Sequence, residues 1–326
     1  MRLVAVPLRI VVMGTGPFAV PMFAALCDSH HEILAVVTRP DHAPPGRRPP
    51  PNPMRAAAMA AGLPILDPER VNDPAAVAAV AALRPDLFVV CDYGQILSRE
   101  LLAVPPLGGI NLHGSLLPRH RGAAPVQWAI LAGDTVTGVS VIHMTPGLDA
   151  GNVITAAATP IGSHETAAEL ERRLAEMGRG PVVEAIDVLQ EAAAAGRLVG
   201  VPQEVAAATR APRITKTDGI IDWTHDAARI ERMRRALEPW PRATTFFERG
   251  DGVRQRLVLE DVAVVASPAA EAAAGTVLVA GGDRLVVACG DGTALEILRL
   301  VPEGRRSMSA AEFLRGSPLR EGSRLG

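Results

Sequence analysis

Asn111 and His113 lie two positions apart in residues 109–119, a stretch that begins with the apolar pattern of a buried strand. Side chains two positions apart in a strand point to the same face, so the amide and the imidazole converge on one spot. Gly114 and Pro118 end the strand just beyond them. Both groups are therefore expected at a strand's carboxyl end, where open α/β sheets bind ligands. An amide can hold a carbonyl oxygen and an imidazole titrates near neutrality, although a histidine at a strand end is also commonly structural.

A single carboxylate, Asp149, follows in the turn-rich segment Gly147-Leu148-Asp149-Ala150-Gly151. A carboxylate on such a loop can orient a histidine or relay protons. Asp-x-Gly is also ordinary turn chemistry. Tyr93, the only tyrosine, follows the most apolar predicted strand and suits either a binding site or the core.

The elements that must position these groups alternate between strand and helix. Residues 8–13, 32–37, 87–91 and 138–143 have the apolar, β-branched pattern of buried strands, and helical stretches separate several of them. This order predicts an α/β fold with a Rossmann-like, doubly wound, mostly parallel sheet. Asn72 or Asp73 is expected to cap a helix over residues 73–83.

The turn after the first strand, Gly14-x-Gly16-x-x-Ala19, matches a dinucleotide-binding fingerprint with alanine in the third place. That fingerprint also needs an acidic residue at the end of the second strand, where this chain has Thr38-Arg39-Pro40. A nicotinamide-dependent dehydrogenase is therefore an alternative with only half of its signal present.

A cationic, proline-rich loop covers residues 39–53 and carries Arg39, Arg47 and Arg48. Proline fixes φ and removes amide donors, so this segment is neither helix nor strand. Loops of this length inside a compact domain are often functional. Contact with phosphate groups and a solvated linker are both compatible with its composition.

The second half of the chain has a different pattern. Helices are expected up to residue 195, a linker over residues 196–212, and then short alternating segments separated by Gly, Asp and Pro. We therefore expect a catalytic domain over residues 1–195 and a second domain over residues 213–326. The alternating segments predict a small antiparallel β-barrel, OB-like in type.

Composition narrows the class of protein further. The net charge is −2, with 15 basic and 19 acidic residues up to residue 208 and 18 basic and 16 acidic residues after it. The second half is thus the better candidate for a polyanion contact. Three scattered cysteines and eight histidines show no metal-ligand spacing, and no apolar run is long enough to span a bilayer. We expect a cytoplasmic protein without a metal.

Taken together, the motifs resemble the formyl-tetrahydrofolate-dependent transformylase family. Asn111-x-His113 and Leu148-Asp149-x-Gly151 mark the family as a whole. The second half is similar to its methionyl-tRNA formyltransferase branch, so the resemblance covers nearly the whole chain. The other matching motifs are Tyr93-Gly94, Arg39-Pro40-Asp41, residues 114–118 and 121–127, Lys216-x-x-Gly219-x-Ile221-Asp222-Trp223, Pro239-Trp240-Pro241 and Met308-Ser309-Ala310.

The resemblance implies transfer of a formyl group from the cosubstrate 10-formyltetrahydrofolate to the α-amine of methionine on initiator methionyl-tRNA, for translation initiation. Asn111 and His113 would stabilise the developing oxyanion, and Asp149 would hold the histidine and help to move a proton. The family's other roles would fall on two groups of residues. The tetrahydrofolate pocket would involve Ser115, Leu116, Leu117, Pro118 and Tyr93, with an apolar wall around Val90 and Ile96, and the tRNA would be contacted by Arg39, Arg47, Arg48 and residues 213–326.

Two departures from the family pattern stand out: Gly16 separates the Gly-Thr pair from Pro17, and His120 replaces the usual aromatic residue. Three alternatives stay open, one of which is the dehydrogenase already considered. The acceptor could be a sugar-nucleotide amine or small metabolite, the turn at Gly14 could bind a nicotinamide, or the chain could bind tRNA without catalysis. The family resemblance implies a monomer.

Overall fold

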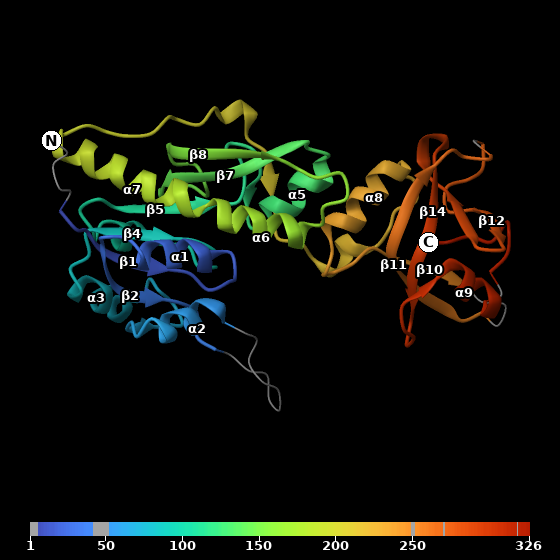
Figure 1. Cartoon of the computed structure of the whole chain (residues 1–326), viewed down its shortest axis with the longest axis horizontal. Coiled ribbons are helices and arrows are strands. Elements are labelled where there is room, and N and C mark those ends of the chain that lie inside the picture. Colours follow the sequence, from blue (N-terminus) through green and yellow to red (C-terminus); the bar gives the residue numbers. More distant parts are fainter. Residues whose placement is uncertain (1–5, 42–51, 249–251, 270, 318) are drawn as a thin grey trace. The chain divides into compact units, whose positions relative to one another are not determined.

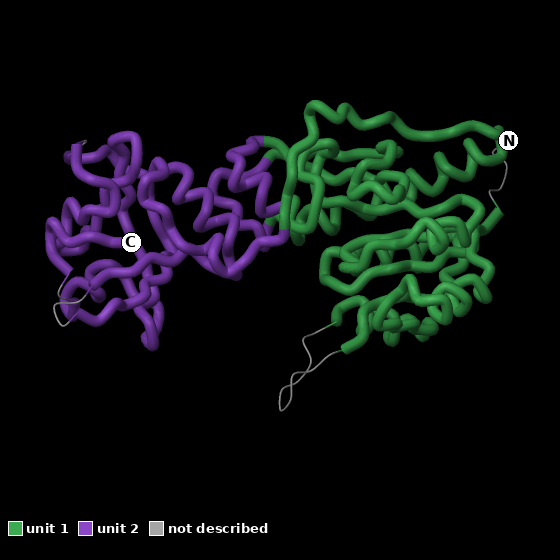
Figure 2. The backbone as a smooth tube through the Cα atoms, turned by 180° about the vertical axis from the view of Figure 1, so that it is seen from behind, with its two compact units in different colours: residues 1–125, 136–160, 170–212 green, residues 126–135, 161–169, 213–326 purple. Residues whose placement is uncertain are grey.

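The structure is a computed structural model that describes residues 6–41, 52–248, 252–269, 271–317 and 319–326. It forms two compact units, shown in green and purple in Figure 2. Unit 1 consists of residues 1–125, 136–160 and 170–212, and unit 2 of residues 126–135, 161–169 and 213–326. Residues 196–212, for which a linker was expected, therefore lie within unit 1.

Unit 1 is built on a seven-stranded sheet in the order β3-β2-β1-β4-β5-β7-β8 (Figure 1). The strands from β3 to β5 are parallel, and β7 and β8 are antiparallel additions at one end. The predicted doubly wound, mostly parallel sheet is confirmed. Its strands are β1 (Arg9–Met13), β2 (Glu32–Val37), β3 (Ile65–Leu66), β4 (Leu87–Val90), β5 (Gly109–His113), β7 (Val136–His143) and β8 (Val153–Pro160).

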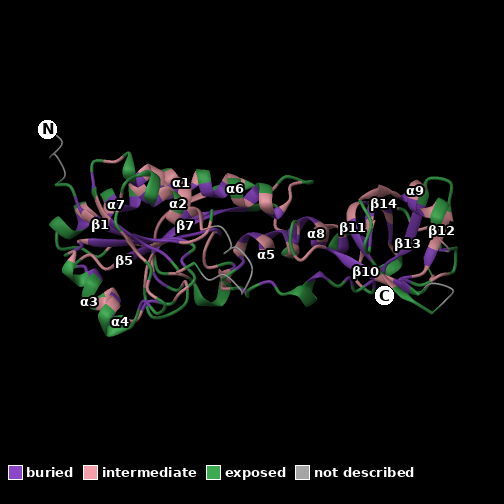
Figure 3. Ribbon diagram, turned by 90° about the horizontal axis from the view of Figure 1, so that it is seen from below, coloured by how far each residue is buried: buried purple, intermediate pink, exposed green. Residues whose placement is uncertain are grey.

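Helices cover both faces of this sheet. In Figure 3, α1 and α7 lie on one side of the strands, with α3 and α4 on the other. Helix α7 packs against β7, β8 and α1. The helices are α1 (Ala19–Cys27), α2 (Pro53–Ala60), α3 (Pro74–Ala82), α4 (Arg99–Leu102), α5 (Pro125–Ala132), α6 (Ala167–Met177) and α7 (Arg179–Ala194). Residues 126–132 of α5 and 167–169 of α6 belong to unit 2.

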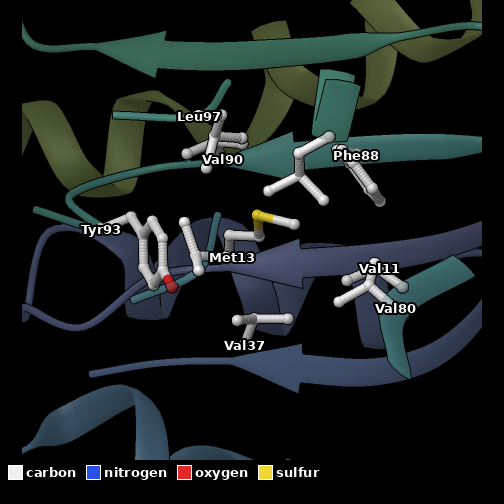
Figure 4. Close-up of a cluster of buried hydrophobic side chains, with 10 residues drawn as sticks. Val11, Met13, Val37, Val80, Phe88, Val90, Tyr93 and Leu97 are labelled. Carbon is white, nitrogen blue, oxygen red and sulfur yellow. The ribbon is translucent and has the colours of Figure 1, made fainter. Parts of the chain in front are cut away.

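A buried hydrophobic cluster joins the central strands (Figure 4). The alternating inward positions of β1 and β4 supply much of it, because both strands are buried on both faces, as parallel strands are. Tyr93, just beyond β4, belongs to the same cluster. Its members are Val11, Met13, Val37, Val71, Val80, Phe88, Val90, Tyr93, Leu97 and Leu101.

The start of α3 differs from the expectation. Asp73 occupies the N-cap position but makes no side-chain cap bond there. Asn72 does not cap the helix. Its amide nitrogen instead donates to the carbonyl of Ile96 at 2.8 Å, and its oxygen accepts from the amide of Ser98 at 2.8 Å. Asn72 thus ties down the chain that follows β4.

Unit 2 contains a curled antiparallel sheet, a half-barrel, in the order β10-β11-β14-β13-β12, with β15 paired to β14. The C-terminal residues run along both edges of this sheet, because Leu325 pairs with Phe247 and Arg324 with Thr276. Its elements are α8 (Ala227–Ala236), β10 (Thr244–Glu248), β11 (Arg254–Val265), β12 (Val277–Gly281), β13 (Arg284–Ala288), β14 (Ala294–Pro302), β15 (Met308–Ser309) and α9 (Ala310–Gly316).

A short parallel pair, β6 (Arg121–Gly122) and β9 (Arg210–Ala211), forms a separate two-stranded sheet in unit 1. Close contact of the two backbones depends on Gly122, which has a φ of 133°. A Cβ there would lie 2.4 Å from the carbonyl oxygen of Ala211. Only glycine adopts this backbone conformation and approach without strain.

Candidate active site

Strand β5 presents Asn111 and His113 from one face, as the strand alternation predicts. It pairs with β4 on one side, where Asn111 lies opposite Val90, and with β7 on the other, where His113 lies opposite Ser140. Leu112, between the two polar residues, is buried. A Cβ added to Gly178 would lie 2.6 Å from the end of its side chain. Packing of Leu112 on the opposite face therefore sets the direction of both polar side chains.

His113 is only 6% exposed. Its Nε2 lies 2.9 Å from the carbonyl oxygen of His120. A carbonyl can only accept, so Nε2 carries a proton and the lone pair of the neutral imidazole is on Nδ1. Nδ1 lies 3.7 Å from Oδ2 of Asp149. Burial lowers the pKa of His113 below 6.5, and Asp149 and the His120 carbonyl oppose that shift.

Asp149 is held on the loop between β7 and β8. Its backbone has a φ of 47°, a left-handed conformation that is uncommon outside glycine. Its Oδ2 accepts a hydrogen bond from the amide of Gly122 at 2.9 Å. The same oxygen faces His113. The carboxylate is thus fixed beside the unprotonated ring nitrogen, where it favours protonation of that nitrogen.

A cavity of about 170 Å³ lies in unit 1 next to these residues. Asn111 and Asp149 line it, and His113, which is nearly buried, contacts Asp149 without being part of the lining. Ile96 and Leu148 also line it and are 74% and 64% exposed, so the cavity opens to solvent. The remaining lining residues are Val90, Tyr93, Gly94, Gln95, Leu97, Ile142, His143, Met144, Thr145, Pro146 and Gly147.

Tyr93 lines the cavity and is 2% exposed. Figure 4 shows its ring near Met13 and Val37 in the core. Among the described residues, its hydroxyl has no hydrogen-bond partner. Burial raises the pKa of Tyr93 to about 12, so the phenol stays protonated at neutral pH and remains a donor.

The stretch from Ser115 to Pro118 is not part of the lining of this cavity. Ser115 is fully buried, and its hydroxyl donates to the carbonyl of Arg119 at 2.7 Å. The hydroxyl of Ser140 donates to the carbonyl of Ser115 at 2.8 Å and accepts from the amide of Leu117 at 3.1 Å. These bonds shape the turn after β5, and a direct role of residues 115–118 in binding stays a prediction.

Arg39 is exposed, and its side chain lies beside Gly94 of the cavity lining, where an added Cβ would be 3.5 Å from Arg39 Cδ. Its carbonyl accepts from Asn52 Nδ2 at 3.1 Å. Asn52 also caps α2 by accepting from the amide of Arg55. The two ends of the proline-rich loop are therefore joined, whereas Arg47 and Arg48 lie outside the described residues.

Two polar residues that support the cavity were not expected from the sequence. Gln95 Oε1 accepts from the amide of Val71 at 3.0 Å. Asn72 holds Ile96 and Ser98. Both sets of bonds span more than 20 residues, so no local pattern identifies them.

Two further findings concern metals and membranes. Within the described part of the chain, no group of three or more His, Cys, Asp and Glu residues could hold a metal ion. The same part of the chain has no helix long and apolar enough to cross a bilayer.

Family models match most of the chain. Residues 8–186 match the formyl transferase model, and residues 213–318 match the model of the formyl transferase C-terminal domain. A methionyl-tRNA formyltransferase of Rhodopirellula baltica is 44% identical, with 99% of this chain and 98% of that protein aligned. One from Gluconobacter oxydans is also 44% identical, over 98% of this chain and 100% of that protein.

Solved structures share the fold at lower identity. The sugar 3N-formyl transferase WlaRD has a TM-score of 0.62 against this chain and is 14% identical to it. The alignment covers 92% of this chain and 99% of that chain. HypX from Aquifex aeolicus, in complex with tetrahydrofolic acid, gives a TM-score of 0.59 with 18% identity. It covers 96% of this chain and 48% of its own. At these identities the likeness concerns the fold.

Proposed function

This chain belongs to the methionyl-tRNA formyltransferase family, and we propose that it transfers the formyl group of 10-formyltetrahydrofolate to the α-amine of methionine on initiator methionyl-tRNA. The product would be N-formylmethionyl-tRNA for translation initiation, made in the cytoplasm. The observation that carries the proposal is the joint placement of Asn111 and Asp149 in the lining of one cavity, with His113 beside Asp149.

The cavity suits a folate. Its lining is largely apolar, with Val90, Ile142 and Met144 among its walls, which fits a flat heteroaromatic ring. Gly94 and Gly147 bring backbone to its surface, and Tyr93 is part of its lining. HypX, a protein of this fold crystallised in complex with tetrahydrofolic acid, supports a folate as the cosubstrate.

The reaction needs one bond made, one bond broken and one proton moved. The methionyl amine attacks the formyl carbon, the carbonyl oxygen becomes negative in a tetrahedral intermediate, and the bond from that carbon to N10 breaks. The attacking amine loses a proton and N10 gains one, so no net proton is needed. Neither an oxidant nor a covalent enzyme intermediate is required.

Each of the three polar residues has a distinct part in these steps. The Asn111 amide would donate to the developing oxyanion, where preorganised donors have their largest effect. The neutral His113 can accept a proton on Nδ1, because its Nε2 proton is committed to the His120 carbonyl. Asp149 would stabilise the resulting imidazolium and help pass the proton towards N10.

The tRNA would contact the cationic loop and the second domain. Arg39 lies beside the cavity lining, and Arg47 and Arg48 follow it in the same loop. Residues 213–326 carry a small excess of basic over acidic side chains, in contrast to the first part of the chain. We propose that a monomer is sufficient for the reaction, which light scattering of the active enzyme would test.

The decisive experiment is single-turnover formylation of methionyl-tRNA by the wild type, His113→Ala and Asp149→Ala. Loss of a positioned acid–base group should lower the rate by about 10²–10⁴. A wild-type rate in either variant would refute the catalytic assignment. Offering a sugar-nucleotide amine as the acceptor, and titrating NADH and NADPH by fluorescence, would reveal the two alternative activities.

A further inference from the structure

Residues 201–211 run beside the loop that carries Asp149 and beside residues 120–122, whose His120 carbonyl bonds to His113. Val201 pairs with Val153 through two backbone hydrogen bonds of 2.8 and 2.9 Å. Further along, the amide of Arg121 donates to the carbonyl of Thr209 at 2.9 Å, where β6 pairs with β9. The segment is therefore held by unit 1 near both of its ends.

Gln203 is half-buried, whereas its neighbours from Val201 to Ala207 are exposed. Its Nε2 donates to the carbonyls of Asp149 at 2.8 Å and Gly151 at 2.7 Å. Its Oε1 accepts from Nε and Nη2 of Arg121 at 3.0 and 2.7 Å. All four hydrogen-bonding positions of one amide are used, and they join the Asp149 loop to β6.

Thr209 contacts His120, the residue whose carbonyl bonds to His113. Its Oγ1 accepts from the amide of His120 at 2.8 Å. The carbonyl of His120 accepts the Nε2 proton of His113. The backbone of His120 has a φ of 60°, a conformation that surrounding contacts must maintain in a non-glycine residue. The Thr209 hydroxyl is one of those contacts.

We propose that Gln203 and Thr209 are positioning residues for formyl transfer. Gln203 holds the backbone of Asp149, and Thr209 holds the carbonyl that orients the His113 imidazole. Neither residue lines the cavity, so each acts through its partner. The inference rests on the proposed catalytic role of His113 and Asp149.

A positioning role predicts a change in the pH dependence of the reaction, whereas a merely structural role does not. The charged groups that bear on His113 are Asp149, which favours the imidazolium, and His120, which opposes it. If Asp149 or the His120 carbonyl moves away from the ring, the imidazolium loses stabilisation and its pKa falls. The acid limb of kcat/KM should therefore shift to lower pH, together with a lower kcat.

The test uses the full-length enzyme and two matched sets of variants. Gln203→Leu removes all four hydrogen bonds, and Glu204→Leu places the same leucine side chain at the exposed neighbouring position as a control. Thr209→Val removes the hydroxyl acceptor while keeping the shape of the side chain, and Thr209→Ser keeps the hydroxyl acceptor. We expect Gln203→Leu and Thr209→Val to lower kcat about 10- to 100-fold, with little change in the KM for the folate and the acid limb displaced. Glu204→Leu and Thr209→Ser should stay within about threefold of the wild type.

The outcomes separate the two proposals. A wild-type kcat and pH profile in Gln203→Leu and Thr209→Val, with His113→Ala and Asp149→Ala inactive, would overturn the positioning role alone. A lower melting temperature with an unmoved pH profile would also overturn it, because the residues would then be merely structural. If Thr209→Val does not fold, Gln203→Leu decides the question. A wild-type rate in His113→Ala would refute the catalytic assignment on which the inference rests, and a wild-type enzyme that does not formylate methionyl-tRNA would refute the proposed function itself.

Discussion

Oδ2 of Asp149 has two neighbours, a hydrogen-bond donor that holds it and a ring nitrogen that it faces. The Gly122 amide donates to it at 2.9 Å and holds it in place. Nδ1 of His113, at 3.7 Å, presents a lone pair to it in the neutral state. Repulsion between that lone pair and the carboxylate is relieved when Nδ1 takes a proton. The pair is thus arranged to receive one during the reaction.

Asn111 is expected to contribute mainly to the transition state. Asn111→Ala should lower the single-turnover formylation rate by about 10²–10³, because removal of one oxyanion donor commonly has that effect. Affinity for the folate, measured by fluorescence titration, should change little. Asn111→Asp keeps the shape but places a negative charge beside the oxyanion, so it should be at least as impaired. Rates near wild type in both variants would contradict the role.

The pH dependence follows from the lowered pKa of His113. The neutral ring is the proton acceptor, so kcat/KM should be constant at neutral pH and fall as pH drops through a pKa below 6.5. Asp149 raises this pKa, so Asp149→Asn should move the limb to still lower pH at reduced activity. A profile measured between about pH 5 and 8 would show the order. An apparent pKa above 6.5 for the acid limb of the wild-type kcat/KM profile would contradict the lowered pKa of His113.

At the level of elements, the loop between β7 and β8 depends on close backbone contact. Gly151 stands where a Cβ would lie 1.8 Å from the carbonyl oxygen of His143. A side chain at position 151 would push the backbone at Gly151 away from the backbone at His143 and so move the loop that carries Asp149. The glycine of the Leu-Asp-x-Gly motif is therefore required by this contact, whatever its part in turn formation.

Gly151→Ala should lower the free energy of unfolding by about 1–3 kcal/mol, because the added methyl group overpacks this contact. The melting temperature and the formylation rate should both fall. Thermal unfolding and single-turnover rates measure the two effects. The control is Gly180→Ala in α7, where the added Cβ would have no atom within 4 Å apart from its chain neighbours and the backbone of its own helix. That change should be neutral or slightly stabilising, since alanine is the better helix former. Equal behaviour of the two variants would refute the contact.

On the scale of the two units together, charge is distributed unevenly although the net charge is only −2. Nearly all positive side chains are arginines, since Lys216 is the only lysine. Arginine binds phosphate bidentately as well as by charge. A nearly neutral chain can therefore still bind RNA through a local arrangement of guanidinium groups.

Affinity for tRNA should fall with salt in proportion to the number of phosphate contacts. Each contact contributes a slope of about −0.7 to −0.9 in a plot of log K against log salt concentration. Arg47→Ala should reduce the magnitude of the slope by about one contact and leave folate binding unchanged. Filter binding across salt concentrations measures it. The same slope in the wild type and in Arg47→Ala would exclude that residue from the RNA contact.

The amino-acid sequence was sufficient for the fold class and for the shared face of Asn111 and His113. Both follow from local periodicity, because alternation within a strand and the succession of strands and helices need no distant partner. The same local patterns predicted that Asn72 or Asp73 caps α3. Asp73 occupies the N-cap position without a side-chain cap bond, whereas the Asn72 side chain bonds to Ile96 and Ser98 instead.

The arrangement around the histidine required the tertiary structure. Oδ2 of Asp149 meets the Gly122 amide across 27 residues, Gln203 reaches Asp149 across 54, and Thr209 reaches His120 across 89. Asp149 and His120 also adopt left-handed backbone conformations, which Asp and His tolerate better than most residues but which remain uncommon outside glycine. Contacts of this kind arise only when the sheet has brought distant loops together, so the side chains were visible in the sequence but their support was not.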